Sequence, residues 1–187
     1  MFQICVCYTV EKWGVSGMEY NDIYDRNRKR TGRTHLRGTP WGKGEYGLVV
    51  CVWVADGKGK VLLTRRAPEK TFAGTWENSG GAAQAGETSR QAIARELFEE
   101  TGIRVDPEEF RLIDSSTERN THFDYYTVVR DVSLEEIVLL PGETDDVKWV
   151  SFDQVAKMIK AKQICKVISR QYMCQKEMIP GWQNAQK

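Results

Sequence analysis

A run of ten residues near the middle of the chain, Tyr46–Ala55, most restricts how this sequence can fold. Its apolar, β-branched and aromatic side chains continue without the alternation that a half-exposed strand would have. Such a run is typical of a strand that is buried on both faces. Residues 56–59 then form a predicted turn, and Lys60–Arg66 a returning strand that completes a hairpin. The fold is therefore predicted to be built around a buried central strand.

Further strands and helices are predicted on both sides of this hairpin. Residues 22–37 suggest two short strands around a polar turn, and Thr88–Thr101 suggests a helix. Later strands are expected at Arg111–Thr117, Asp124–Arg130 and Val147–Val150, and closing helices at Asp153–Ala161 and Ile164–Gln175. Because strands and helices do not alternate regularly, the expected fold class is α+β or a mixed-sheet sandwich.

The length of 187 residues fits one domain of ordinary size with extra residues at its ends. We predict an N-terminal extension at residues 1–17, a domain at residues 18–176 and a C-terminal tail at residues 177–187. The net charge of +1 disfavours binding to nucleic acid through bulk charge. No run approaches the roughly 18 apolar residues of a membrane span, so no membrane association is expected.

The five cysteines are an odd number without a Cys-x-x-Cys pair, which indicates neither a disulfide framework nor a structural zinc site. Cys5 and Cys7 are interpreted as incidental or buried thiols. The apolar start at Met1–Val10 lacks the basic region and the cleavage site of a signal peptide. A reducing, cytoplasmic location is therefore expected. The oligomeric state stays open, with a homodimer as one option.

The helix predicted at Thr88–Thr101 has recognisable ends. Thr88 and Gln91 match a capping box, and Gly102 suits the position just beyond the last turn. At about 100° per residue, one broad arc of this helix is expected to face the core. That arc holds Ile93, Ala94, Leu97, Phe98 and Thr101.

Three glutamates, Glu96, Glu99 and Glu100, share a second arc within about a turn and a half. Like charges at this spacing cost roughly 0.2–0.5 kcal/mol a pair, and acids near the helix end roughly 0.3–1 kcal/mol each. A divalent cation would compensate, and oxygen ligands favour Mg²⁺ or Mn²⁺. Arg95 lies beside this arc, where it could orient Glu99. The alternative is a solvent-facing charged surface with an Arg95–Glu99 ion pair.

The spacing of charged residues and glycines over residues 81–103 resembles the Nudix box. With x for any residue, the segment reads Gly81-x5-Glu87-x7-Arg95-Glu96-Leu97-x-Glu99-Glu100-x-Gly102-Ile103, and every defined position of that motif matches. The chain is therefore similar to the Nudix hydrolase superfamily. This resemblance implies a Nudix-type α/β/α sandwich around a mixed β-sheet.

The resemblance also implies roles for individual residues and a cofactor, Mg²⁺ or Mn²⁺. The implied metal ligands are the carbonyl of Gly81 and the side chains of Glu96, Glu99 and Glu100. The implied catalytic residues are Glu99, Glu100, the orienting Arg95, and Glu87, which supports the loop and the helix. The general base stays open between Glu99, Glu100 and an acid outside the motif.

Segments outside the motif resemble the bacterial Nudix branch near isopentenyl-diphosphate isomerase, over roughly residues 19–160. They include residues 30–35 (Arg-Thr-Gly-Arg-Thr-His), 64–66 (Thr-Arg-Arg) and 72–76 (Phe-Ala-Gly-Thr-Trp). The catalytic cysteine of that isomerase falls on Gly80 here, and two of its histidine ligands fall on Gly47 and Ala82. Without the thiol, isomerase activity ranks below hydrolysis.

Substrate contacts are expected from outside the motif. Arg65 and Arg66 end the predicted returning strand, and Asp124 falls where the isomerase has an acid, so these three are candidate substrate-binding residues. Six Lys and Arg residues within residues 26–37 form either a solvated hairpin or a basic rim that attracts a phosphorylated substrate.

Other polar and aromatic residues carry weaker signals. Glu118 and Glu143 are candidates for an additional base or ligand, whereas His122, Trp53 and Trp76 are expected to be structural. The predicted function is Mg²⁺-dependent hydrolysis of a diphosphate linkage in a small molecule, a nucleoside diphosphate derivative or a related organic pyrophosphate. The alternatives are an isomerase-like enzyme and a non-catalytic Nudix-fold binding module.

Overall fold

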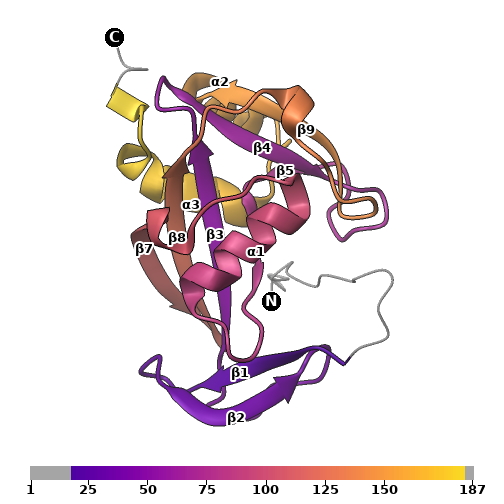
Figure 1. Ribbon diagram of the computed structural model, residues 1–187, viewed down its shortest axis with the longest axis vertical. Coiled ribbons are helices and arrows are strands. Elements are labelled where there is room, and N and C mark those ends of the chain that lie inside the picture. Colours follow the sequence, from indigo (N-terminus) through magenta and orange to yellow (C-terminus); the bar gives the residue numbers. More distant parts are fainter. Residues whose placement is uncertain (1–17, 184–187) are drawn as a thin grey trace.

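The computed structural model describes residues 18–183, which Figure 1 shows as a ribbon. The strands are β1 (Tyr20–Tyr24), β2 (Arg30–Leu36), β3 (Gly47–Ala55), β4 (Lys60–Arg66), β5 (Trp76–Glu77), β6 (Ser79–Ala82), β7 (Arg111–Glu118), β8 (Thr121–Val129) and β9 (Thr144–Ser151). The helices are α1 (Ser89–Thr101), α2 (Phe152–Lys160) and α3 (Lys166–Gln175). Short 3-10 turns lie at Pro107–Glu109, Leu134–Glu136 and Lys176–Met178. The predicted extension at residues 1–17, with Cys5 and Cys7, lies outside the described residues.

A mixed sheet of seven strands forms the centre of the domain, with β3 in its middle. Strands β5, β4, β3, β8 and β7 follow one another across it, while β6 pairs with β3 and β9 pairs with β4. Every residue of β3 is buried, and β3 runs parallel to β8 along its whole length. The predicted buried central strand and the α+β class are therefore confirmed.

The predicted hairpin of β3 and β4 is confined to its closed end. Only Ala55 and Val61 pair across the two strands, whereas β4 pairs with β9 along its whole length. β3 instead pairs with β6, with Val49–Val52 opposite Ser79–Ala82. The predicted ladder between β3 and β4 was therefore wrong beyond the turn, because the two strands separate and take different partners.

Helices cover both faces of the sheet, as Figure 1 shows with α1 in front and α3 behind. On the first face, α1 buries Ile93 and Leu97 against Val50 and Val52 of β3. On the opposite face, side chains of α2 and α3 form a second core with β3 and β4, which includes Trp53, Leu63, Val155, Ile168 and Tyr172. This arrangement is the α/β/α sandwich that the resemblance implied.

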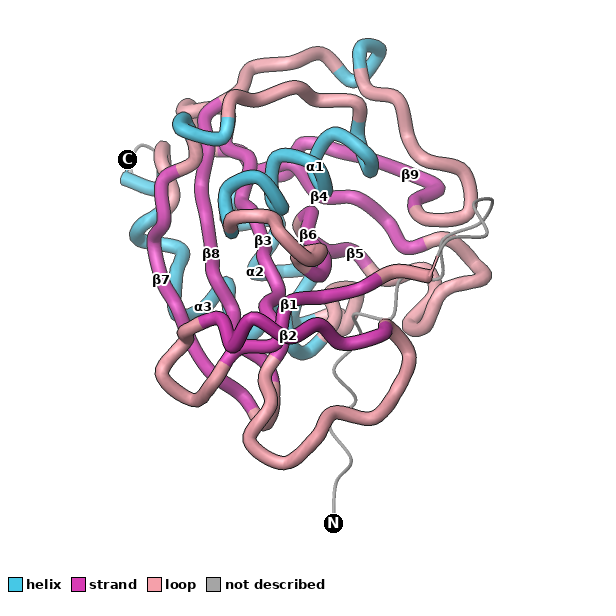
Figure 2. Tube along the Cα trace, turned by 60° about the horizontal axis from the view of Figure 1, so that its bottom comes forward, coloured by secondary structure: helices cyan, strands magenta, loops and turns pink. Residues whose placement is uncertain are grey.

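A separate two-stranded sheet of β1 and β2 lies across one end of the domain, near the start of α1 (Figure 2). The strands pair antiparallel from Tyr20–Leu36 to Tyr24–Arg30, which confirms the two short strands that were predicted. The backbones of Tyr24 and Tyr46 exchange two hydrogen bonds of 2.8 and 3.0 Å. The small sheet is therefore fastened to the main sheet just before β3 begins.

Strands β5 and β6 were not predicted from the sequence. β6 contains two consecutive glycines and no β-branched residue, so it lacks the composition that favours a strand. A Cβ atom at Gly80 would lie less than 3.0 Å from the carbonyl oxygen of Val50 in the neighbouring β3. The close approach of two backbones therefore requires glycine at this position.

Packing continues beyond residue 176, where the predicted domain ends. Ile179 is buried in the core beside α2 and α3, and the ring of Trp182 packs edge-on against Phe152 with centroids 4.9 Å apart. Residues 179 and 182 thus contribute to the second core.

No disulfide joins Cys51, Cys165 and Cys174 to one another. Within residues 18–183, no helix combines the length and the apolar character that crossing a membrane requires.

Candidate functional site

Helix α1 carries the candidate site, and its ends are fixed as the sequence predicted. The side chain of Thr88 accepts a hydrogen bond from the Gln91 N–H at 3.2 Å, and the Thr88 N–H donates to Gln91 Oε1 at 2.9 Å. This pair is a complete capping box. Gly102 has a φ of 73°, a left-handed conformation that suits glycine, and its N–H donates to the Phe98 carbonyl.

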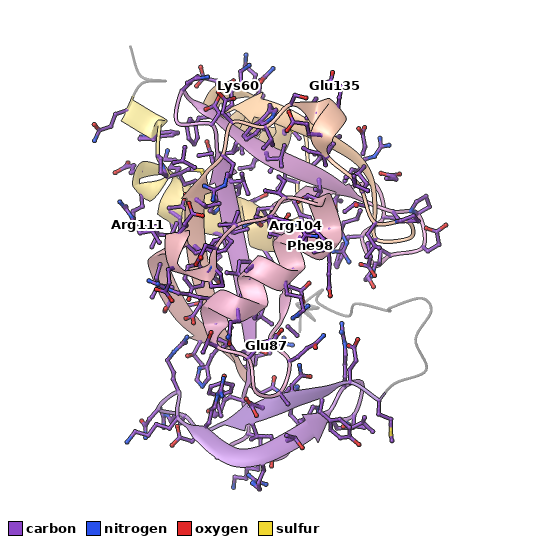
Figure 3. All side chains as sticks on the ribbon, in the orientation of Figure 1. Lys60, Glu87, Phe98, Arg104, Arg111 and Glu135 are labelled. Atoms are coloured by element: carbon purple, nitrogen blue, oxygen red, sulfur yellow. The ribbon has the colours of Figure 1, made fainter. Side chains whose placement is uncertain are left out.

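The buried face of α1 is rotated relative to the predicted one. Ile93, Leu97 and Thr101 are buried as expected, but Glu96 is also buried, with 7% of its surface exposed. Phe98 is 38% exposed, so its predicted core position was wrong. The guanidinium of Arg104 lies 4.0 Å from the centre of the Phe98 ring, and Figure 3 shows the two residues side by side. The rotation brings Glu96 against the sheet.

Arg95 connects the acids of this site to one another. Its Nε donates to Glu87 Oε1 at 2.6 Å and its Nη2 to Glu87 Oε2 at 3.0 Å. Its Nη1 donates to Glu96 Oε1 at 2.7 Å and to Glu99 Oε2 at 3.1 Å. The Arg95–Glu99 contact was predicted, while the paired contact with Glu87 was not. One guanidinium therefore orients three carboxylates.

Glu87 holds the loop in front of α1, as the resemblance implied. One of its carboxylate oxygens accepts a hydrogen bond of 2.8 Å from the Gln84 N–H. Arg95 Nη2 also donates to the Ala82 carbonyl at 3.1 Å, so loop and helix are tied together twice. Figure 3 places Glu87 at the end of α1 that faces the small β1–β2 sheet.

Gly81 lies directly against Glu96. A Cβ atom at this position would come within 3.0 Å of the Glu96 carboxylate, so any larger residue would displace that group. Gly81 is fixed in β6 by its pairing with Val50 of the central strand. The backbone of β6 and the acid of α1 therefore meet without a side chain between them.

Burial and mutual repulsion disfavour the charged forms of these acids. Burial raises the pKa of Glu96, and the charges of Arg95 and, more weakly, Arg37 oppose that rise. Burial raises the pKa of Glu100 well above its ordinary value, and the charges of Glu96 and Glu77 add to the effect. A cation brought close to these carboxylates would favour their ionised forms.

Glu96, Glu99 and Glu100 form what we call the α1 acid cluster, and its donors fit a hard divalent cation. Carboxylate and carbonyl oxygens without histidine or thiolate are the ligands that suit Mg²⁺ or Mn²⁺. Within the described part of the chain, no three acidic, histidine or cysteine side chains already converge as a metal cage. Arg95 holds two of the carboxylates instead. Ion binding would therefore reposition side chains of this cluster.

A second charged group lies beside Glu100 and was not predicted as a unit. Arg66 Nη1 contacts both carboxylate oxygens of Glu77, at 2.7 and 2.9 Å, and Lys70 forms an ion pair with Glu143. Burial raises the pKa of Glu77 to about 7, although the charge of Arg66 opposes the rise. Recognising β5 as a strand would have placed Glu77 here, because alternate residues of a strand share one face.

The three candidate substrate-binding residues differ in their surroundings. Arg65 contacts Asp145 at 2.7 Å, and 37% of its side chain is exposed. Arg66 is buried against Glu77, as described above. Asp124 is buried and accepts hydrogen bonds from Ser89 Oγ at 2.6 Å, Ser115 Oγ at 2.8 Å and the guanidinium of Arg28. Asp124 thus lies under the first turn of α1, away from the α1 acid cluster.

His122 and the core aromatic residues are structural, as expected. His122 is fully buried between Thr117 Oγ1 and the Asp25 carbonyl, each 2.8 Å from a ring nitrogen. Trp53 and Trp76 belong to the second core. Glu118 forms an ion pair of 3.3 Å with Arg170 of α3, the helix on the opposite face of the sheet from α1.

Comparison with known proteins shows similarity in sequence to a family model and to individual relatives. A model of the NUDIX domain matches residues 45–171 of this chain. An uncharacterized Nudix hydrolase of Listeria monocytogenes is 34% identical over 145 residues, which cover 74% of this chain and 83% of that relative. The NUDIX match includes β3, β6 and α1, which carry the candidate site.

Solved structures share the fold. DR0079 from Deinococcus radiodurans superposes with a TM-score of 0.67 at 22% identity, over 81% of this chain and 96% of that chain. A bifunctional NMN adenylyltransferase/ADP ribose pyrophosphatase from Francisella tularensis, solved in complex with AMP and a manganese ion, has a TM-score of 0.55 at 27% identity. That match covers 71% of this chain and 42% of the bifunctional chain.

Proposed function

Because this chain belongs to the NUDIX domain family, we propose that it hydrolyses a diphosphate linkage with Mg²⁺ as its cofactor. The chain is a Nudix hydrolase by its family, and enzymes of this family act on small molecules. The proposed substrate is a nucleoside diphosphate derivative or a related organic pyrophosphate. The Francisella neighbour, named as an ADP ribose pyrophosphatase and solved with AMP and manganese, supports this class.

One observation carries the proposal: Arg95 orients Glu87, Glu96 and Glu99 around a backbone that leaves no side chain at Gly81. A helix optimised for stability alone would not place several acids near its negative end. A cation bound by these acids would offset that electrostatic cost. This geometry favours an enzyme over a non-catalytic binding module, which has no need of the α1 acid cluster.

The proposed chemistry assigns a task to each group. When bound, Mg²⁺ supplies positive charge against the diphosphate and makes a water molecule more acidic. Glu96, Glu99, Glu100 and the Gly81 carbonyl would hold it, and Arg95 keeps the carboxylates in place. The attacking water passes its proton to Glu99 or Glu100 as its oxygen bonds to phosphorus and the bridging P–O bond breaks.

Isomerase activity is not proposed, for a steric reason. An isomerase of the kind that this chain resembles would need its catalytic thiol at position 80, where this chain has Gly80. A Cβ atom there would meet the Val50 carbonyl oxygen and the Cα atom of Cys51 within about 3 Å, and both belong to the backbone of β3. A cysteine would therefore fit only if the central strand moved.

Among the three candidates for substrate contact, we propose Arg65 as a contact to an outer part of the ligand, since its guanidinium is partly exposed and lies over Trp76 of the second core, on the face of the sheet opposite α1. Arg66 and Asp124 lie on the α1 side and are buried among charged or polar partners. Arg66 and Asp124 would act by positioning Glu77 and the start of α1.

The cysteine composition supports the proposed cytoplasmic location. A homodimer is the proposed assembly, which sedimentation would test.

A product panel tests the proposed function. Purified protein is incubated with ADP-ribose, nucleotide sugars, dinucleotides, nucleoside triphosphates and isopentenyl diphosphate, with and without Mg²⁺. We expect cleavage of at least one diphosphate, only when Mg²⁺ is present. Conversion of isopentenyl diphosphate without phosphate release would contradict the proposal.

Substitutions in the α1 acid cluster give the first mutational prediction. Glu99→Gln and Glu100→Gln should each lower kcat by about 100-fold or more, because each removes a charge that acts in the reaction. Glu136→Gln, an exposed acid outside the site, is the matched control and should keep the wild-type rate. Steady-state kinetics and melting temperatures on all three variants decide the question. Full activity in both cluster variants would remove the α1 acid cluster from the mechanism.

A further inference from the structure

The small β1–β2 sheet packs against the loop that follows Gly81. The Ala85 N–H donates to the Tyr20 carbonyl at 2.8 Å, and Asn21 Nδ2 donates to the Ala83 carbonyl at 2.7 Å. The Gly86 N–H donates to a carboxylate oxygen of Asp22 at 2.9 Å. Three hydrogen bonds therefore fix β1 beside the segment that joins β6 to α1.

Arg37 directly follows β2 and extends this small sheet by one residue pair. Its N–H donates to the Glu19 carbonyl at 2.9 Å, and its Nη1 forms an ion pair with the Glu19 carboxylate. Its Nη2 is buried and has no hydrogen-bond partner among residues 18–183, while 22% of the Arg37 side chain is exposed. Glu19 therefore holds the Nη1 end of the Arg37 guanidinium, while Nη2 makes no hydrogen bond to the described residues.

Three other arginines of this hairpin have their acceptors. Arg28 pairs with Asp124, Arg30 with Asp22 and Arg33 with Glu45. Among the arginines of the described hairpin, only Arg37 has a buried side-chain nitrogen without a partner. Arg37 lies at the end of the small sheet that packs against the loop after Gly81, because its backbone pairs with Glu19, the residue before Tyr20.

A buried guanidinium donor without a partner costs free energy, which an incoming acceptor recovers. The planar guanidinium fork suits phosphate oxygens, and such charge-assisted hydrogen bonds are the strong ones. Resting on the proposed function, we propose that Arg37 binds a phosphate oxygen of the diphosphate substrate through its unused Nη2. The β1–β2 sheet is thereby part of the substrate site, and the basic rim acts through this one residue.

Calorimetric titration tests this role without relying on turnover. Imidodiphosphate, a non-hydrolysable diphosphate, is titrated in the presence of Mg²⁺ into wild-type protein and four variants. Arg37→Ala should raise the Kd by about 10- to 100-fold, and Arg37→Lys, which keeps the charge but loses the fork, by less. Arg33→Ala, an exposed arginine of the same sheet, is the matched control and should bind as the wild type does.

Glu19→Gln separates substrate binding from mere support of the sheet, because it keeps an oxygen that can accept from Arg37 Nη1. Its Kd should stay within about threefold of the wild-type value. An equal loss in Glu19→Gln and Arg37→Ala would overturn the role of Nη2. A Kd unchanged in folded Arg37→Ala would overturn it as well. If Arg37→Ala does not fold, Arg37→Lys decides: weaker binding supports the proposal, and a wild-type Kd overturns it.

The same experiment distinguishes this inference from the proposed function. A wild-type protein that cleaves no diphosphate of the panel and does not bind imidodiphosphate contradicts both. A wild-type protein that cleaves a diphosphate, together with an Arg37→Ala variant of unchanged Kd, contradicts the role of Arg37 alone. A Mn²⁺ titration without imidodiphosphate should give the same affinity, within about twofold, in wild type and Arg37→Ala. A large change there would mean that Arg37 serves the metal site instead.

Discussion

Arg95 is the residue on which the order of the site depends. It donates hydrogen bonds to Glu87, Glu96 and Glu99, and its pKa is raised far above the ordinary value, because the bonds to these carboxylates, chiefly Glu87, outweigh the cost of burial. It stays charged at any pH at which the protein folds. Three carboxylates are therefore gathered around one guanidinium before a cation arrives, and ion binding would then reposition those of the α1 acid cluster.

Glu77 gives a prediction about stability and pH. Burial raises its pKa from 4.5 to about 7, against the opposing charge of Arg66. An acid whose pKa is higher in the folded protein favours folding fully below its unfolded pKa, and this contribution is lost as pH rises through the folded pKa. At about 1.4 kcal/mol per pH unit, about 3 kcal/mol is lost between pH 4.5 and 7.

Denaturant unfolding across this pH range checks that prediction. The free energy of unfolding of the wild type should fall by about 3 kcal/mol relative to Glu77→Gln, which has no proton to lose. Mg²⁺ is omitted so that ion binding does not contribute. Parallel curves for the two proteins would mean that Glu77 ionises normally.

Sequence alone named most residues of the candidate site and missed those that other parts of the fold bring to it. The α1 acid cluster, Glu87 and Arg95 follow from their spacing, because one helix carries nearly all of them. Glu77 and Arg37 could not be found in that way. Glu77 lies in β5 and Arg37 directly after β2, and only the packing of β5 and of the β1–β2 sheet brings them near α1.

At the scale of elements, α1 was the easiest to predict because its signals are local. The capping box and the glycine beyond its end lie within the helix itself. Its buried face was harder, since contact with β6 rotates Phe98 outward and Glu96 inward. Strand partners were hardest, because β4 pairs with β9, more than seventy residues later, instead of β3.

The capping box of α1 gives a prediction at this scale. Thr88→Ala removes the side chain that accepts from Gln91 N, and it should lower the free energy of unfolding by about 1 kcal/mol. Ser133 begins a 3-10 turn without any side-chain capping bond, so Ser133→Ala is the matched control. Its effect should stay within about 0.5 kcal/mol. Denaturant unfolding of both variants would reveal equal effects if the cap contributed nothing.

At the scale of the whole molecule, the site lies where separate parts of the fold meet. The central sheet supplies Gly81 through β6, the helix layer supplies the α1 acid cluster, and the small β1–β2 sheet packs beside both (Figure 1). The sequence predicted the central strand, α1 and the two strands of the small sheet, but it predicted neither β6 nor the contacts that join these parts, such as the one between Asn21 and Ala83. We therefore expect the proposed function to depend on the assembled fold and not on the motif alone.

The central claim is that the α1 acid cluster binds divalent ions against a diphosphate. Anomalous scattering from crystals of the full chain, grown with Mn²⁺ and imidodiphosphate, tests it most directly. We predict a manganese peak about 2 Å from carboxylate oxygens of Glu96, Glu99 or Glu100, with phosphate oxygens on its other side. Imidodiphosphate bound elsewhere, with no peak at the α1 acid cluster, would contradict the account.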